Sequence, residues 1–241
     1  MMKLALGHVA IAIVCAALLL IPATPIGGVH PALKPLKFAL SIALLLGTVA
    51  IMLRYARTTD IASWVLGIAL SVEMIAIVVQ ALRGQPSHWN TSTFVNAAIW
   101  RVMGAGVIVA MVALLAIAFE LSTKPLALPP VIAFGIRAGL WLMFLAAISG
   151  VAMGGRGQHT VGGPDGGAGI PITSWSRSHG DLRIPHFIAL HSIQAIPLLA
   201  ALSTRLSANA IAQWTITIVG IVVWIGVAII TLVQALAGRP W

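Results

Sequence analysis

The chain has 241 residues, of which 60% are hydrophobic and only 8% are charged. Soluble domains carry about 25% charged residues, so this composition excludes a soluble fold and indicates an integral membrane protein. The formal net charge is +9. The Lys and Arg residues are scattered singly among loops and helix ends, without a basic stripe interleaved with aromatic residues, so nucleic acid is excluded as a partner.

Seven apolar segments are each long enough to cross a bilayer, which takes roughly 20 residues. We therefore expect an all-α fold, a seven-transmembrane-helix bundle that forms a single integral membrane domain over residues 1–241. The predicted helices are 4–23, 37–56, 61–83, 95–119, 131–153, 185–203 and 211–237. The first segment follows Lys3 as a signal peptide would, but no clean A-x-A cleavage site follows it, and we expect a retained helix.

Residues 154–184 form a Gly-rich connection that is far longer than most loops. Ordered loops of such length are usually functional. His159, Trp175 and Asp181 lie within it, and such residues are not typical of flexible linkers. We predict a folded functional loop that acts as a lid or contributes to binding.

Seven crossings place the chain's ends on opposite sides of the membrane. The Lys and Arg residues of the N-terminal side are Lys3, Arg54, Arg57, Lys124 and Arg205. Those of the opposite side are Lys34, Lys37, Arg83, Arg156, Arg177, Arg183 and Arg239. This near balance leaves the orientation open under the positive-inside rule. Since several charges beside loop 154–184 belong to a polar cluster, we favour the loop on the outer face.

Two pairs of sequence segments suggest an internal repeat. VVQALRGQP at 78–86 matches LVQALAGRP at 232–240, and PLKFALS at 35–41 matches PHFIALHS at 185–192. Both pairs run in the same direction and order, as in a 3+1+3 parallel repeat in which the fourth predicted helix is the linker. Chance similarity among apolar helices is the open alternative.

Polar residues gather near one end of several predicted helices. An ionisable group inside a bilayer costs about 2.5–3.5 kcal/mol, so Glu73, Arg101 and His191 each need a partner or a purpose. Glu73 and Gln80 are seven residues apart and share a helix face, as do His191 and Gln194 at a spacing of three. These spacings predict a one-sided polar pocket, while a structural ion pair between Glu73 and Arg101 is the alternative.

Histidines in this region also suggest a bound metal ion or haem. Imidazole suits zinc, copper, iron and nickel, and the candidate ligands are His159, His186 and His191. The spacing of five between His186 and His191 differs from the i, i+4 pair of a zinc helix. A metal or haem and ordinary hydrogen-bonded histidines both remain open, so the cofactor is unknown.

Four runs resemble an uncharacterised family of bacterial seven-helix integral membrane proteins. These runs are HPALKPLKFALS, QALRGQPSHWN, HTVGGPDGGAGIP and GDLRIPHFIALHSIQAIPL, from His30 to about Leu199, with Trp89 where that family often has Phe. The resemblance implies a bacterial protein, which we place in the inner, or cytoplasmic, membrane. It implies no activity.

We expect a membrane-embedded enzyme that acts on a lipophilic or amphiphilic small molecule. The expected catalytic residues are His191, His186, Glu73, Arg101 and Asp181. The expected substrate-binding residues are Lys37, Gln80, Arg83, His88, Asn90, Arg183, Gln194 and Trp175. A transporter or channel that uses the same pocket is the first alternative, and a non-catalytic receptor or assembly factor is the second. The lipid bilayer is the expected partner, and the oligomeric state is open.

Overall fold

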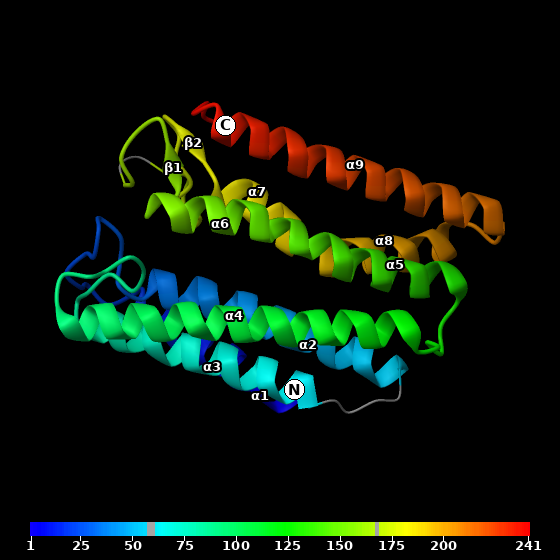
Figure 1. The fold of residues 1–241 in the computed structure, drawn as a ribbon, viewed down its shortest axis with the longest axis horizontal. Helices are drawn as coiled ribbons and strands as arrows, with labels where there is room; N and C mark the ends of the chain where they lie inside the picture. Colours follow the sequence, from blue (N-terminus) through cyan, green and yellow to red (C-terminus); the bar gives the residue numbers. More distant parts are fainter. Residues whose placement is uncertain (57–60, 167–168) are drawn as a thin grey trace. The chain divides into compact units, whose positions relative to one another are not determined.

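The computed structural model describes residues 1–56, 61–166 and 169–241. The chain packs as two compact units, Met1–Pro125 and Leu126–Trp241 (Figure 1). The single membrane domain expected from the sequence stays a prediction. Arg57, one of the charges weighed for the orientation, lies outside the described residues, as do positions 167–168 of the long loop.

The first unit consists of long helices. They are α1 (Met2–Leu18), α2 (Leu33–Tyr55), α3 (Ile61–Leu82) and α4 (Phe94–Thr123). α1 ends five residues earlier than predicted because Pro22 and Pro25 follow, and a proline disfavours the helical conformation of the residue before it. α2 begins four residues earlier than predicted, since Pro35 falls in its first turn, where a backbone N–H is not needed.

Packing in the first unit follows the rules of membrane helices. α2 packs against α1 and α3, and α3 packs against α4. Small residues such as Ala5 and Ala12 of α1 and Ala39 of α2 are buried, because close approach of the backbones is what drives helix association in lipid.

The second unit contains more interruptions. Its elements are α5 (Pro130–Leu142), the 3-10 turn η1 (Met143–Leu145), α6 (Ala146–Arg156), β1 (Thr160–Val161), β2 (Gly180–Asp181), α7 (Arg183–Leu190), α8 (Ser192–Leu206) and α9 (Ala210–Leu236). β1 and β2 pair antiparallel, with Thr160 opposite Asp181. The predicted loop 154–184 therefore contains a small sheet in its described part.

The predicted helix 185–203 is two helices, α7 and α8, that meet at a bend of 46°. The hydroxyl of Ser192 donates to the carbonyl oxygens of Ala189 and Gly139. A serine that bonds to the preceding turn competes with the backbone ladder and bends helices. This competition explains why the apolar run 185–203, predicted as one helix, folds as two.

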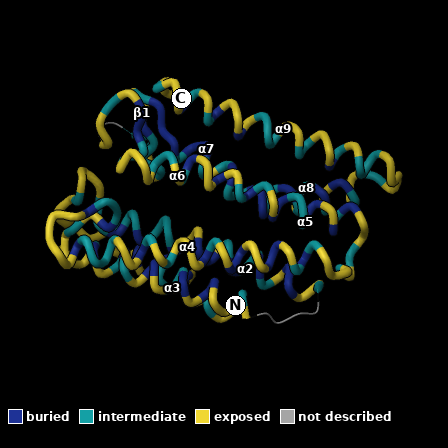
Figure 2. Tube along the Cα trace, viewed as in Figure 1, coloured by how far each residue is buried: buried dark blue, intermediate teal, exposed yellow. Residues whose placement is uncertain are grey.

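The described residues include five helical segments that are long and apolar enough to cross a membrane: α2, α3, α4, α9 and the continuous segment Pro130–Arg156, which contains α5, η1 and α6. The number is six if the bent pair α7–α8 is one span. α1, with 17 residues, is shorter. Only 17% of the apolar window of α9 is buried, and exposed positions recur along its length (Figure 2). The chain is thus an all-α protein with several apolar helices, as a multi-pass membrane protein requires.

Candidate functional site

The first unit buries an acid inside a membrane-type helix. Glu73 of α3 is 5% exposed, and its Oε2 atom has no hydrogen-bond partner among the described residues. On α4, a Cβ added at Gly106 would lie 3.8 Å from the Ala69 carbonyl and 4.0 Å from Glu73 Oε2. Gly106 therefore faces the acid from α4 at an ordinary van der Waals distance, where a methyl group would also fit.

His88 faces this acid from the turn that follows α3. Its Nε2 atom lies 4.0 Å from Glu73 Oε1, just beyond direct hydrogen-bond range. Its Nδ1 atom lies 3.1 Å from the Ser87 hydroxyl. Burial and, to a smaller extent, the positive charge of Lys34 lower the pKa of His88 to about 3. His88 is therefore a neutral imidazole at physiological pH, with one donor and one acceptor nitrogen.

Aromatic rings surround His88. The ring centroids of Phe38 and Trp100 lie 5.5 Å and 5.4 Å from that of His88, and the Trp89 ring lies 6.1 Å away. Trp89 adopts a φ of 53°, a left-handed conformation that is uncommon for a bulky residue and implies local strain. Lys34 extends over Phe38, with Nζ 5.9 Å from the ring centroid. We call Glu73, His88 and these three aromatic residues the α3–turn cluster.

A network of amides fixes the turn that carries His88. Gln80, which is fully buried, donates to the side-chain oxygen of Asn96 over 3.2 Å, and Arg83 donates to the same oxygen over 3.0 Å. Asn90 donates to the Pro86 carbonyl and accepts from Ser92. Of the predicted substrate-binding residues, Gln80 and Arg83 thus bind each other and Asn96 of α4, while Asn90 binds within the turn.

The alternative of a Glu73–Arg101 ion pair is wrong for the described residues. Glu73 is buried, whereas Arg101 lies on the exposed surface of α4, and no ion pair joins them. Lys37 is partly buried on α2, and its substrate-binding role stays a prediction.

In the second unit, His186 and His191 have separate partners. His186 Nδ1 lies 2.9 Å from the Ala146 carbonyl and 3.2 Å from the Ser149 hydroxyl, which ties α7 to the start of α6. His191, at the α7–α8 bend, places Nδ1 3.1 Å from Gln194 Oε1. Its ring centroid lies 4.1 Å from that of Phe187, whose ring meets Trp175 at 5.6 Å.

Two aspartates organise the long loop. The carboxylate of Asp181 has no exposed surface and accepts from the side chain of Arg183 and from the backbone N–H groups of Ser176 and Arg183. Burial alone would raise the pKa of Asp181, but these hydrogen bonds and the charge of Arg183 lower it. Asp165 accepts from the backbone N–H groups of His159 and Thr160.

These contacts give the predicted loop residues a structural setting. His159 Nδ1 lies 3.2 Å from Asp165 Oδ1 and 3.8 Å from Asp181 Oδ1, and Arg183 also donates to the Ser174 carbonyl. Because Asp181 and Arg183 satisfy each other, the geometry does not favour their predicted acid–base and anion-binding roles, which stay predictions.

The described residues bring no three His, Cys, Asp or Glu side chains together in a way that could hold a metal ion. The proposed ligands His159, His186 and His191 are each bonded to different partners instead. The expectation of a His-bound metal or haem therefore receives no support from the ligand geometry.

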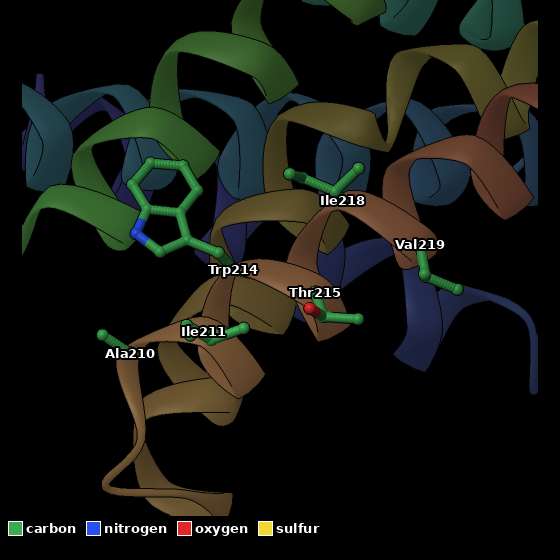
Figure 3. A pocket seen from close by; sticks show the side chains of 6 residues that line it. All are labelled: Ala210, Ile211, Trp214, Thr215, Ile218 and Val219. Atoms are coloured by element: carbon green, nitrogen blue, oxygen red, sulfur yellow. The ribbon is translucent and has the colours of Figure 1, made fainter.

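Two apolar grooves lie away from these polar residues. One, of about 390 Å³, is lined by residues of α9 that include Ile211, Trp214 and Ile218 (Figure 3). The other, of about 380 Å³, lies between α3 and α4 and includes Val65, Val109 and Val112. Their apolar walls suit lipid chains and hold none of the predicted site residues.

Comparison with known proteins gives no match among family models, curated proteins or solved structures. Sequence reasoning selected Glu73 and His88 but overlooked their neighbours Phe38, Ser87, Trp89 and Trp100. In the sequence, these aromatic residues lie near the same ends of the predicted helices, which could have indicated that they are neighbours. Aromatic residues that anchor helices at the membrane interface produce the same pattern.

Proposed function

We propose that this protein is a membrane-embedded enzyme that acts on a lipophilic or amphiphilic small molecule by acid–base chemistry at Glu73 and His88. The observation that carries the proposal is the buried carboxyl of Glu73, of which one oxygen has no hydrogen-bond partner in the described part of the chain and the other faces the neutral imidazole of His88 at 4.0 Å. A buried ionisable group in a membrane helix is costly, and such groups mark functional sites.

The pair suits proton transfer. Because the pKa of His88 is about 3, its neutral imidazole is a weak base that serves as a hydrogen-bond partner, while the Glu73 carboxyl group gives a proton to the substrate or takes one from it. Ser87 holds the second ring nitrogen of His88 and thereby orients the ring. Phe38, Trp89 and Trp100 supply apolar faces for the substrate, and the amide network around Gln80 and Asn96 keeps the turn in place.

Lipid extracts of cells test this proposal. Wild type is compared with Glu73→Gln, which keeps the shape of the side chain, and with Glu120→Gln as a matched control whose glutamate pairs with Lys124. Relative to cells without the protein, we expect the amount of a lipid-soluble compound to change in cells with wild type and with Glu120→Gln. We expect no such change with Glu73→Gln at an equal protein level. Identical extracts from all three strains would overturn the proposal.

A transporter is the second candidate, and equivalent features of the two units support it. α3 and α9 are each followed by a glycine with positive φ, Gly84 at 67° and Gly238 at 70°. Gln80 donates to the Pro86 carbonyl, and Gln234 donates to the Pro240 carbonyl six residues further along in the same way. The two matching sequences thus also end their helices alike.

The other helices support the same correspondence. α2 and α7 both begin two residues before a buried proline, Pro35 and Pro185. The buried residues of α1 match buried residues 128 positions later: Ala5 with Ala133, His8 with Ile136, Ala12 with Leu140 and Cys15 with Met143. We infer a 3+1+3 repeat with α4 as its linker. Repeats of this kind are common in transporters.

Proteoliposomes separate the two candidates. A transporter dissipates an imposed proton or substrate gradient in proportion to protein, and Glu73→Gln abolishes that flux. An enzyme converts its substrate in detergent or nanodiscs, where no gradient exists. Gradient-dependent flux without conversion would favour the transporter.

We further propose seven membrane crossings in a bacterial inner membrane, with α1, α5–α6 and α7–α8 each counted as one crossing and with loop 154–184 outside. The test uses Ser178→Cys in a Cys15→Ser background and a membrane-impermeant maleimide. We expect labelling of intact spheroplasts at position 178 and protection of an N-terminal tag. Labelling only after lysis would reverse the orientation.

A further inference from the structure

Opposite charges meet where Lys34 lies beside the α3–turn cluster. Glu73 supplies the one acid, and Lys34 is close enough for its positive charge to act on both Glu73 and His88. His88 is neutral. A cationic ligand would meet Lys34 and an anionic ligand would meet Glu73, so the site suits a head group without net charge.

The face of the Phe38 ring, which could bind a cation, is already occupied by the Lys34 ammonium group. Lys34 Nζ lies 5.9 Å from the Phe38 ring centroid, within the range of a cation–π contact. A lipophilic cation that bound at the Phe38 face would have to displace this ammonium group. The positive charge of Lys34 also repels a cation at the neighbouring rings, which disfavours quaternary ammonium and phosphonium compounds.

The exposed surface that remains is aromatic. Trp89, Trp100 and the His88 ring are each partly buried and partly accessible, and the two indole centroids lie 6.2 Å apart. Indole and imidazole faces favour offset or edge contacts with another planar ring. Glu73 accepts a hydrogen bond from a hydroxyl group, and Lys34 donates one to a carbonyl or hydroxyl oxygen.

We propose that the α3–turn cluster binds a lipid-soluble planar ring that carries hydroxyl or carbonyl oxygens, the chemical class of quinones and quinols. This inference rests on the proposed function and specifies the substrate class of that same site. It concerns recognition of the ring: the oxygens of the head group meet Glu73, His88 and Lys34, and the ring lies against Trp89 and Trp100.

Binding is measured with the purified full chain in lipid nanodiscs by titration calorimetry, with decylubiquinone as the probe and tetraphenylphosphonium in a parallel titration. We expect saturable binding of decylubiquinone that weakens at least about fivefold in Glu73→Gln and in Trp100→Leu. Trp64→Leu is the matched control, because Trp64 lies on the exposed surface of the first turn of α3, and it should bind like wild type. Melting curves confirm that the variants are folded.

Three results would overturn the proposal. They are no saturable binding of decylubiquinone by wild type, equal binding by wild type and both site variants, and tighter binding of tetraphenylphosphonium that depends on Glu73. Its failure is separable from that of the proposed function. If Glu73→Gln changes the lipid extracts while decylubiquinone does not bind, the acid–base site stands and the substrate belongs to another class.

Discussion

His88 Nε2 lies 4.0 Å from Glu73 Oε1, and the other oxygen of this buried carboxyl has no hydrogen-bond partner among the described residues. A structural ion pair would place two opposite charges in contact and satisfy both carboxyl oxygens. Here the neighbour is a neutral imidazole. An unsatisfied acid in an apolar helix lowers stability, so its retention points to a use other than folding.

Glu73→Gln should leave the melting temperature unchanged or raise it, because the amide removes a buried ionisable group and keeps the volume of the side chain. Differential scanning fluorimetry in detergent measures this, with Glu120→Gln as the control. A melting temperature clearly below that of wild type would show that Glu73 stabilises the fold and would contradict a purely functional role.

His88 should be a neutral imidazole at pH 5, because its buried site and the nearby Lys34 lower its pKa to about 3. The ¹⁵N chemical shifts of selectively labelled histidine, assigned with His88→Gln, report the charge and tautomer. An imidazolium signal for His88 at pH 5 would mean that an ionised Glu73 outweighs both effects.

Asp181→Asn should destabilise the long loop by roughly 3 kcal/mol, the typical cost of breaking a buried charge pair. The lowered pKa of Asp181 has a consequence in wild type as well. Its stabilising contribution is present above the ordinary aspartate value, about 3.9, and is lost as the pH falls through the lower folded value.

Hydrogen exchange of residues 157–166 and 169–182 measures both effects, with Arg177→Gln as a control, since the Arg177 side chain is exposed on the same loop. We expect faster exchange in Asp181→Asn at pH 7, and in wild type only below about pH 4. Unchanged exchange in Asp181→Asn would mean that the Arg183 pair does not hold the loop.

Gly180→Ala should lower stability by roughly 1–3 kcal/mol, because an added Cβ would collide with the Ala235 carbonyl of α9. This close contact docks β2 on the end of α9. Thermal unfolding measures the effect, and Gly155→Ala is the control, since an added Cβ there meets nothing within 4 Å. Equal melting temperatures for the two variants would contradict the docking.

The sequence predicts the long apolar helices well because their length and composition alone determine them. α3 ends one residue from its predicted end, and α9 differs by one residue at each end. The α7–α8 bend depends on hydrogen bonds of Ser192, including one to Gly139, 53 residues away, which no local pattern reveals. In the site, the position of Glu73 within an apolar helix and its spacing of seven from Gln80 predicted a functional acid. The contact of His88 with Glu73 could not be predicted, because it depends on how the turn after α3 folds back.

Turnover by the purified chain tests the central claim most directly. Wild type, Glu73→Gln and Glu120→Gln in nanodiscs are incubated with a total lipid extract, and the products are analysed by mass spectrometry. We predict a product that forms with time in wild type and in Glu120→Gln, and that falls to background in folded Glu73→Gln. Equal product formation by Glu73→Gln would contradict an acid–base role for the Glu73–His88 pair.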